Sequence, residues 1–215
     1  MPANLLSGNY QKKCIKGSKF LSSLDQNWNS LVSSVGPCKL NLSSELEPYQ
    51  ALIKSVIFQQ LRPASATAIF NRFKQNFDNN FPTEEKILAS PESKLKESGL
   101  SFNKRKTIIE IARHVQKGEL ENRQGFLMMN DIQIIEKLTK IKGIGEWTAQ
   151  MLMIFNLGKL DVFPVSDFAL RKNYSLFKSI ASPLTMRELS KISEEWKPFR
   201  SIAAWYLWRY ANKLN

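Results

Sequence analysis

No stretch of this chain shows the sustained two-residue alternation of apolar and polar side chains that marks a half-buried β-strand. The only strand-like piece, Asp161–Val165, contains Pro164, which lacks the N–H group that a sheet ladder needs. Apolar residues recur instead at steps of three and four, most clearly over Ser43–Gln60. The sequence therefore predicts an all-α protein with this helix near its centre.

Further helices are expected where the same periodicity recurs between polar or Gly/Pro links. Their ranges are Ala64–Asn76, Thr83–Ala89, Pro91–Ser98, Lys104–Lys117, Asp131–Thr139, Glu146–Leu157, Asp167–Phe177, Thr185–Trp196 and Arg200–Asn212. We expect two lobes. Residues 44–165 form a central helical lobe, and residues 1–43 plus 166–215 form the other from the N- and C-terminal helices.

The charge balance indicates the kind of partner. The chain has 31 Lys and Arg against 19 Asp and Glu, a net charge of +12 with its single histidine, His114, neutral. Such a surplus attracts polyanions, of which nucleic acid is the commonest. The basic residues are spread along the chain rather than gathered on one amphipathic segment, which favours a folded basic face over membrane binding.

Cysteine content limits the chemistry. Cys14 and Cys38 are too few for a disulfide framework, an iron–sulfur cluster or a closed zinc site, so we expect no cofactor. The first nine residues lack the apolar core of a secretory signal. We expect an intracellular protein, cytoplasmic and nucleoid-associated in a bacterium or nuclear in a eukaryote.

Residues 138–157 predict a hairpin of two helices. Gly143 and Gly145 suit a sharp turn that needs positive φ or the close approach of another chain. The N–H groups that open the second helix attract anions, and a nucleic-acid phosphate fits there without any side chain. Lys140 and Lys142 flank the turn and add attraction that is independent of base sequence. A plain corner between two helices explains the glycines equally well.

An acidic residue at the start of a predicted helix follows the hairpin. Asp167 lies 22 positions after Gly145, at the start of a predicted helix and behind the rigid Phe163-Pro164 pair. The positive end of a helix dipole attracts negative charge at this place. Most acids in a first helical turn are only caps. A carboxylate held in a half-buried cleft can also stabilise positive charge that develops on a sugar.

Together these segments resemble the helix-hairpin-helix (HhH-GPD) DNA glycosylases, and most of all the 3-methyladenine DNA glycosylase II group. The resemblance covers residues from about 25 to 212 and implies a two-lobed helical bundle with the active-site cleft between the lobes. We expect a compact form without the N-terminal β domain of some members. The matching segments, in the family's order, are Phe58–Leu61, Gly99–Lys104, Leu138–Ala149, Val162–Asp167 and Trp196–Trp208.

The resemblance implies a monomeric enzyme that binds damaged double-stranded DNA and everts an alkylated base of the 3-methyladenine or 7-methylguanine type. It then hydrolyses the N-glycosidic bond, which initiates base excision repair. Asp167 is the implied catalytic residue, and Gln60, with Leu61 as the alternative, is the wedge that fills the vacated stack. The aromatic pocket candidates are Trp147, Phe58, Phe168, Trp205 and Trp208. The candidates for binding the DNA backbone are Lys140, Lys142, Gly143, Gly145, Thr148 and Lys104.

One position separates two reaction types. Bifunctional members of the superfamily carry a lysine nucleophile two residues after the second hairpin glycine, where this chain has Trp147. The resemblance therefore implies hydrolysis without strand cleavage. It also implies a structural Na+ or K+ on main-chain carbonyls near Lys140, Gly143 and Gly145, with no metal held by side chains. Two alternatives stay open: a glycosylase for an oxidised or deaminated base, and a non-catalytic DNA-binding protein.

Overall fold

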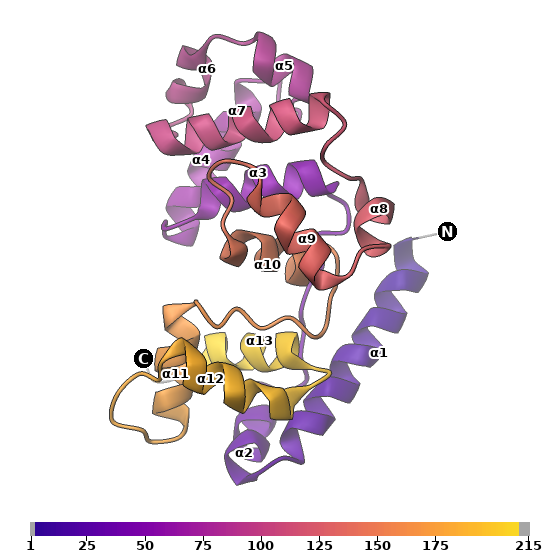
Figure 1. The fold of residues 1–215 in the computed structure, drawn as a ribbon, viewed down its shortest axis with the longest axis vertical. Helices are drawn as coiled ribbons and strands as arrows, with labels where there is room; N and C mark the ends of the chain where they lie inside the picture. The colour runs from indigo at the N-terminus through magenta and orange to yellow at the C-terminus, as the bar shows by residue number, and fades with distance from the viewer. Residues whose placement is uncertain (1–2, 211–215) are drawn as a thin grey trace. The chain divides into compact units, whose positions relative to one another are not determined.

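The computed structural model describes residues 3–210, with side chains from residue 8 onward. Within that range the chain forms thirteen α-helices and one 3-10 helix and no strand (Figure 1). None of the helices in this described part is both long and apolar enough to cross a membrane. The prediction of an all-α protein is confirmed.

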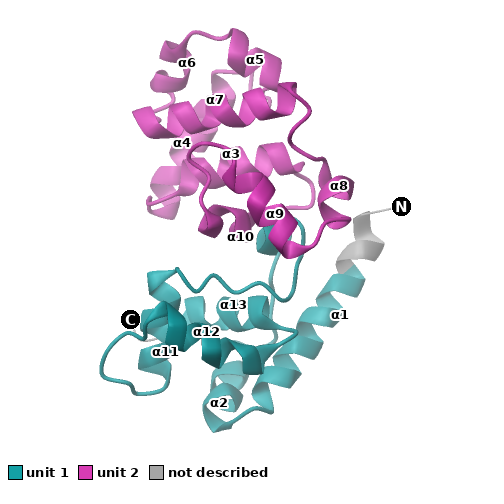
Figure 2. Cartoon of the chain, in the orientation of Figure 1, with its two compact units in different colours: residues 1–42, 153–215 teal, residues 43–152 magenta. Residues whose placement is uncertain are grey.

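Two compact units make up the chain, and each is described by itself (Figure 2). The central unit, residues 43–152, contains α3 (Pro48–Phe58), α4 (Pro63–Gln75), α5 (Glu84–Ala89), α6 (Glu92–Glu97), α7 (Phe102–Gln116), α8 (Arg123–Leu127), α9 (Asp131–Thr139) and most of α10 (Glu146–Phe155). The terminal unit, residues 1–42 and 153–215, contains α1 (Ala3–Ser22), α2 (Gln26–Val35), α11 (Phe168–Phe177), α12 (Met186–Ser193), η1 (Glu194–Trp196) and α13 (Arg200–Tyr210).

Helix α3 is the hub of the central unit. It contacts α4 and α7, and α5 and α6 also pack on α7. The helix begins at Pro48 rather than at Ser43, because proline suits the first helical position and the Gln50 side chain accepts a hydrogen bond from Glu47 N–H at 3.1 Å. Its buried apolar side chains after the first turn are Ala51, Leu52, Ile53, Val56 and Ile57.

Helix α13 is the hub of the terminal unit, where α1, α2 and α11 each contact it. Every side chain of α13 from Ser201 to Leu207 is buried. Helix α1 approaches closely at Gly17, where a Cβ atom would lie 2.2 Å from Ile202 Cδ1. Aromatic rings fill the space around these helices, and Trp28 meets Trp196 edge-on with centroids 5.5 Å apart. Segments from the two ends of the chain therefore share one core.

The segment after α10, residues 158–165, is bound to the start of α13. The Ser201 N–H donates to Leu160 O at 3.0 Å. The Arg200 guanidinium holds the Asp161 carboxylate through Nε to Oδ1 at 2.8 Å and Nη2 to Oδ2 at 3.1 Å. These bonds tie the segment to the terminal unit. The units divide between residues 152 and 153, within α10, whereas the sequence pattern placed the division after residue 165.

Candidate functional site

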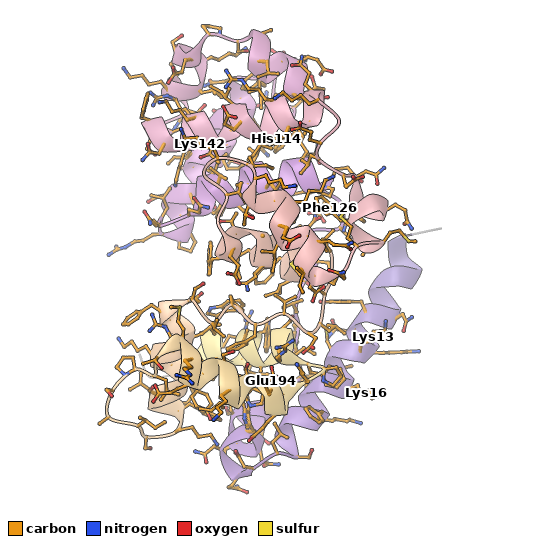
Figure 3. All side chains as sticks on the ribbon, viewed as in Figure 1. Lys13, Lys16, His114, Phe126, Lys142 and Glu194 are labelled. Carbon is orange, nitrogen blue, oxygen red and sulfur yellow. The ribbon has the colours of Figure 1, made fainter. Side chains whose placement is uncertain are left out.

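The predicted hairpin is present as α9, a turn over residues 140–145, and α10. Two isoleucines fix the turn to the core, since Ile141 and Ile144 are both buried and the Ile144 N–H donates to Ile141 O at 3.0 Å. Lys140 and Lys142, on either side of Ile141, are exposed, and Figure 3 labels Lys142 on this turn. The turn therefore offers its basic side chains to solvent while its apolar ones anchor it.

The two hairpin glycines serve different purposes. Gly143 has φ +94°, and a Cβ atom there would lie 2.0 Å from Oγ1 of Thr107 on α7, so both its backbone and its surroundings exclude a side chain. Gly145 has no positive φ, and a Cβ atom there would meet nothing within 4 Å. The fold requires the first glycine, whereas the second leaves main chain open to an approaching molecule.

Helix α10 starts directly after Gly145, so the positive end of its dipole lies at the exposed turn. The Glu146 carboxylate accepts from Gln150 Nε2 at 3.0 Å, a bond that directs it along the helix. The Gly145 carbonyl accepts from Ala149 N–H at 3.1 Å and is directed the same way. The expected monovalent cation therefore stays a prediction for the remaining turn carbonyls, those near Lys140 and Gly143.

Two residues expected to bind the DNA backbone use their side chains inside the central unit instead. Thr148 is only 3% exposed, and its Oγ1 accepts from Gln59 Nε2 at 2.8 Å, so its side chain lies in the protein interior and its contact with the DNA backbone stays a prediction. The Lys104 ammonium donates to Ile57 O at 2.9 Å and to Gln59 O at 2.8 Å. Burial lowers the pKa of Lys104. Because two of its three donors are engaged, Lys104 has one donor left for the contact with the DNA backbone that the sequence predicts.

Both wedge candidates lie on the short loop between α3 and α4. Gln60 has φ +55°, a left-handed conformation that residues with a side chain seldom adopt. The side chains of Gln60 and Leu61 are both exposed. The loop thus presents two neighbouring side chains to solvent, and the choice between them as the wedge stays a prediction.

Asp167 is the N-cap of α11, and three donors orient its carboxylate. Oδ1 accepts from Ala169 N at 2.8 Å and from Leu170 N at 3.3 Å, while Oδ2 accepts from Trp208 Nε1 at 3.1 Å. The carboxylate is half-buried. Trp208 also stacks on Phe155, with centroids 5.8 Å apart and an interplanar angle of 29°. Trp208 therefore positions the acid, a role that residue type alone did not reveal.

The other pocket candidates differ in accessibility. Phe168, next to Asp167, is 58% exposed; Trp147 is also exposed, and Phe58 is half-buried. Trp205 is only 4% exposed, and the Arg209 guanidinium lies 3.7 Å from its ring centroid. The expectation that a base stacks on Trp205 needs correction, because the ring belongs to the core and a cation covers one face.

The site residues fall into two sets, one in each unit. The terminal unit brings together Asp167, Trp208 and Phe168 through contacts of α11 with α13. The central unit contains the hairpin, the wedge loop, Phe58 and Trp147.

Comparison with known proteins shows the family to which the chain belongs. Residues 53–198 match the family described as HhH-GPD superfamily base excision DNA repair protein. DNA-3-methyladenine glycosylase 1 of Schizosaccharomyces pombe is 40% identical over 196 residues, 90% of this chain and 86% of that protein. The alkylbase DNA glycosidase-like protein mag2 of the same yeast is 36% identical over 196 residues, 90% of this chain and 92% of that protein.

Solved structures give the same result. The S. pombe 3-methyladenine DNA glycosylase Mag1, in complex with abasic DNA, superposes with a TM-score of 0.85 at 39% identity, covering 90% of this chain and 95% of that one. A DNA-3-methyladenine glycosidase from Bacillus halodurans superposes with a TM-score of 0.80 at 29% identity, covering 92% of this chain and 90% of that one.

Proposed function

Because the chain belongs to the HhH-GPD superfamily of base excision DNA repair proteins, we propose that it is a DNA-3-methyladenine glycosylase. It binds duplex DNA as a monomer, everts an alkylated base and hydrolyses the bond between base and deoxyribose. The names of the two yeast relatives and of the bacterial structure support alkylated bases as substrates. The proposal places the protein where DNA is, in the bacterial cytoplasm or the eukaryotic nucleus.

The orientation of Asp167 carries the proposal. An N-alkylated purine is cationic and leaves easily, so the bond from C1′ to the base nitrogen breaks with its electron pair going to the base. The sugar then develops positive charge, which a fixed carboxylate stabilises. Asp167 suits this task because Ala169 N, Leu170 N and Trp208 Nε1 hold both of its oxygens. Water bonds to C1′, and its proton passes to the carboxylate.

In this proposal the central unit binds the DNA backbone and everts the damaged base. The exposed main chain around Gly145 and the side chains of Lys140 and Lys142 bind phosphates. Gln60 or Leu61 fills the space that the everted nucleotide leaves. The proposal requires that this unit and the Asp167 set act on one duplex.

We also propose that the products are a free base and an uncut strand. A lyase step needs an amine that forms a Schiff base with C1′. Trp147 occupies the position where bifunctional members carry that amine, and an indole has no nucleophilic amine to offer.

The decisive experiment measures base release from N-methylated duplex under single-turnover conditions. Asp167→Asn keeps a good N-cap. Its side chain has a single acceptor oxygen, however, whereas the aspartate uses one oxygen for α11 and the other for Trp208. We expect the rate to fall by about 100-fold or more while binding to abasic duplex is retained. Glu195→Gln, an exposed carboxylate of the same unit, is the charge-matched control and should act as the unaltered protein does.

The other outcomes identify the alternatives. Release of an oxidised or deaminated base, without release of methylated purines, would indicate a glycosylase of different specificity. Tight binding without release of any base, unchanged in Asp167→Asn, would indicate a DNA-binding protein without chemistry.

A further inference from the structure

The loop that carries both wedge candidates is held at two points inside the central unit. From α7, the Lys104 ammonium donates to Ile57 O at 2.9 Å and to Gln59 O at 2.8 Å. From α10, Thr148 Oγ1 accepts from Gln59 Nε2 at 2.8 Å. Three helices, α3, α7 and α10, therefore converge on Gln59, the residue that precedes the wedge.

Lys104 satisfies a specific electrostatic need. Helix α3 ends at Phe58, so Ile57 O and Gln59 O belong to the helix end, where carbonyls lack intrahelical donors and the dipole is negative. A cation is favoured at this position. The next residue, Gln60, turns the chain with φ +55°. Such a conformation persists only where its surroundings hold it.

The two basic residues that follow Lys104 make different contacts. Arg105 pairs with Glu92 Oε1 at 2.9 Å and donates to Leu100 O at 2.8 Å. Lys106 is exposed, with Nζ 4.2 Å from the centroid of the Phe102 ring. Of these three consecutive basic residues, only Lys104 reaches the end of α3, so its role is separable from the general positive charge of α7.

We propose that Lys104 is a positioning residue for base eversion, which holds the α3–α4 loop rigid so that Gln60 and Leu61 enter the base stack as a preformed wedge. The inference rests on the proposed glycosylase function for its consequence in catalysis. The bond from Gln59 to Thr148 extends the same brace to the first turn of α10, where the hairpin meets phosphate. Strand grip and wedge thus share one rigid support within the central unit.

A preformed wedge matters because ordering a flexible loop during eversion would consume binding free energy. Loss of the brace should therefore slow eversion while leaving phosphate contacts intact. A phosphate-binding lysine behaves in the opposite way, since its removal weakens binding to all duplexes and lowers the slope of log affinity against log salt by about one.

The first test needs no substrate. Hydrogen exchange of the free protein is compared for the unaltered chain, Lys104→Met, Lys104→Arg and the control Lys106→Met. Methionine keeps much of the apolar stem but removes the donors. We expect amides of residues 59–62 to exchange at least about tenfold faster in Lys104→Met, with exchange nearly normal in Lys104→Arg and unchanged in Lys106→Met. Equal exchange in all four proteins would overturn the proposal that Lys104 holds the loop rigid, whether or not the protein releases bases.

The second test uses single-turnover release from methylated duplex. Lys104→Met should release base about tenfold more slowly with unchanged affinity and salt slope. Placing the lesion opposite an abasic site, where stacking is already weakened, should restore most of the rate. A reduced salt slope with uniformly weaker binding would overturn the proposal. If the unaltered protein releases no base, the glycosylase function fails, and hydrogen exchange still decides whether Lys104 braces the loop.

Discussion

Alanine at Gly143 and alanine at Gly145 should have opposite consequences, although the two glycines lie one residue apart. At Gly143 the new side chain must adopt φ +94°, which costs about 1–2 kcal/mol for a left-handed residue. Its Cβ would also lie 2.0 Å from Thr107 Oγ1, an overpacking that costs about 1–3 kcal/mol. Gly143→Ala should therefore lower the free energy of unfolding by about 2–5 kcal/mol.

At Gly145 the methyl group meets no protein atom within 4 Å and the backbone needs no positive φ. The stability change should stay within about 1 kcal/mol, the usual difference between glycine and alanine at a helix start. Duplex binding is different. If a phosphate approaches the main chain at Gly145, the methyl group occupies its place, and affinity should fall by about tenfold or more, or about 1.4 kcal/mol.

Urea unfolding followed by circular dichroism measures the first effect, and fluorescence anisotropy with labelled duplex measures the second. A double-mutant cycle with Thr107→Ala isolates the steric part, because that change removes Oγ1 at 2.0 Å and Cγ2 at 3.0 Å and keeps Thr107 Cβ at 3.0 Å. Gly143→Ala should then cost about 1–3 kcal/mol less in this background. Equal costs at the two glycines, or no coupling to Thr107, would refute the steric reasoning. Unchanged binding by Gly145→Ala would refute a close phosphate there.

Three further outcomes are expected. Trp208→Phe keeps an aromatic ring but removes the hydrogen bond from Nε1 to Asp167 Oδ2. Single-turnover base release should therefore fall about tenfold without a change in duplex affinity. An unchanged rate would show that Trp208 is not a positioning residue. With Trp147 at the lyase position, borohydride should trap no covalent complex with methylated duplex, and a trapped complex would show a lyase. Although burial raises the pKa of Asp25, the hydrogen bond from Lys178 lowers it, so the net pKa lies below its ordinary value. Asp25→Asn should therefore lower the free energy of unfolding by about 1 kcal/mol at pH 7, discounted for solvent exposure, and urea unfolding should show this loss shrink as the pH falls below about 4 and vanish only below the lowered native pKa, where both states bind the proton.

Apolar periodicity predicted that the chain is helical and where most helices after residue 43 lie. The first and last residues of the helices and the boundary between the units depended on individual contacts. The pattern over Ser43–Gln60 overran α3 at its start, because periodicity continues through residues that Pro48 excludes from the helix. It gave no range for α1 or α2, and it did not predict the short helix α8, which has too few residues to show a period. The unit boundary was displaced because Arg200 reaches Asp161, 39 residues earlier in the chain, and no local pattern records such a pairing.

For the site, residue type indicated which chemistry is available but not where hydrogen-bonding capacity is used. Trp205 and Trp208 lie three residues apart on α13, at a spacing that puts both on one helix face. Arg209 covers the ring of Trp205 in the core, whereas Trp208 donates to Asp167, 41 residues earlier. Lys104 is a similar case, since a lysine in a basic segment suggests a phosphate contact until its carbonyl partners 45 and 47 residues away are known. For Trp208 and Lys104 the deciding partner is distant in sequence, so local patterns could nominate these residues but could not assign their roles.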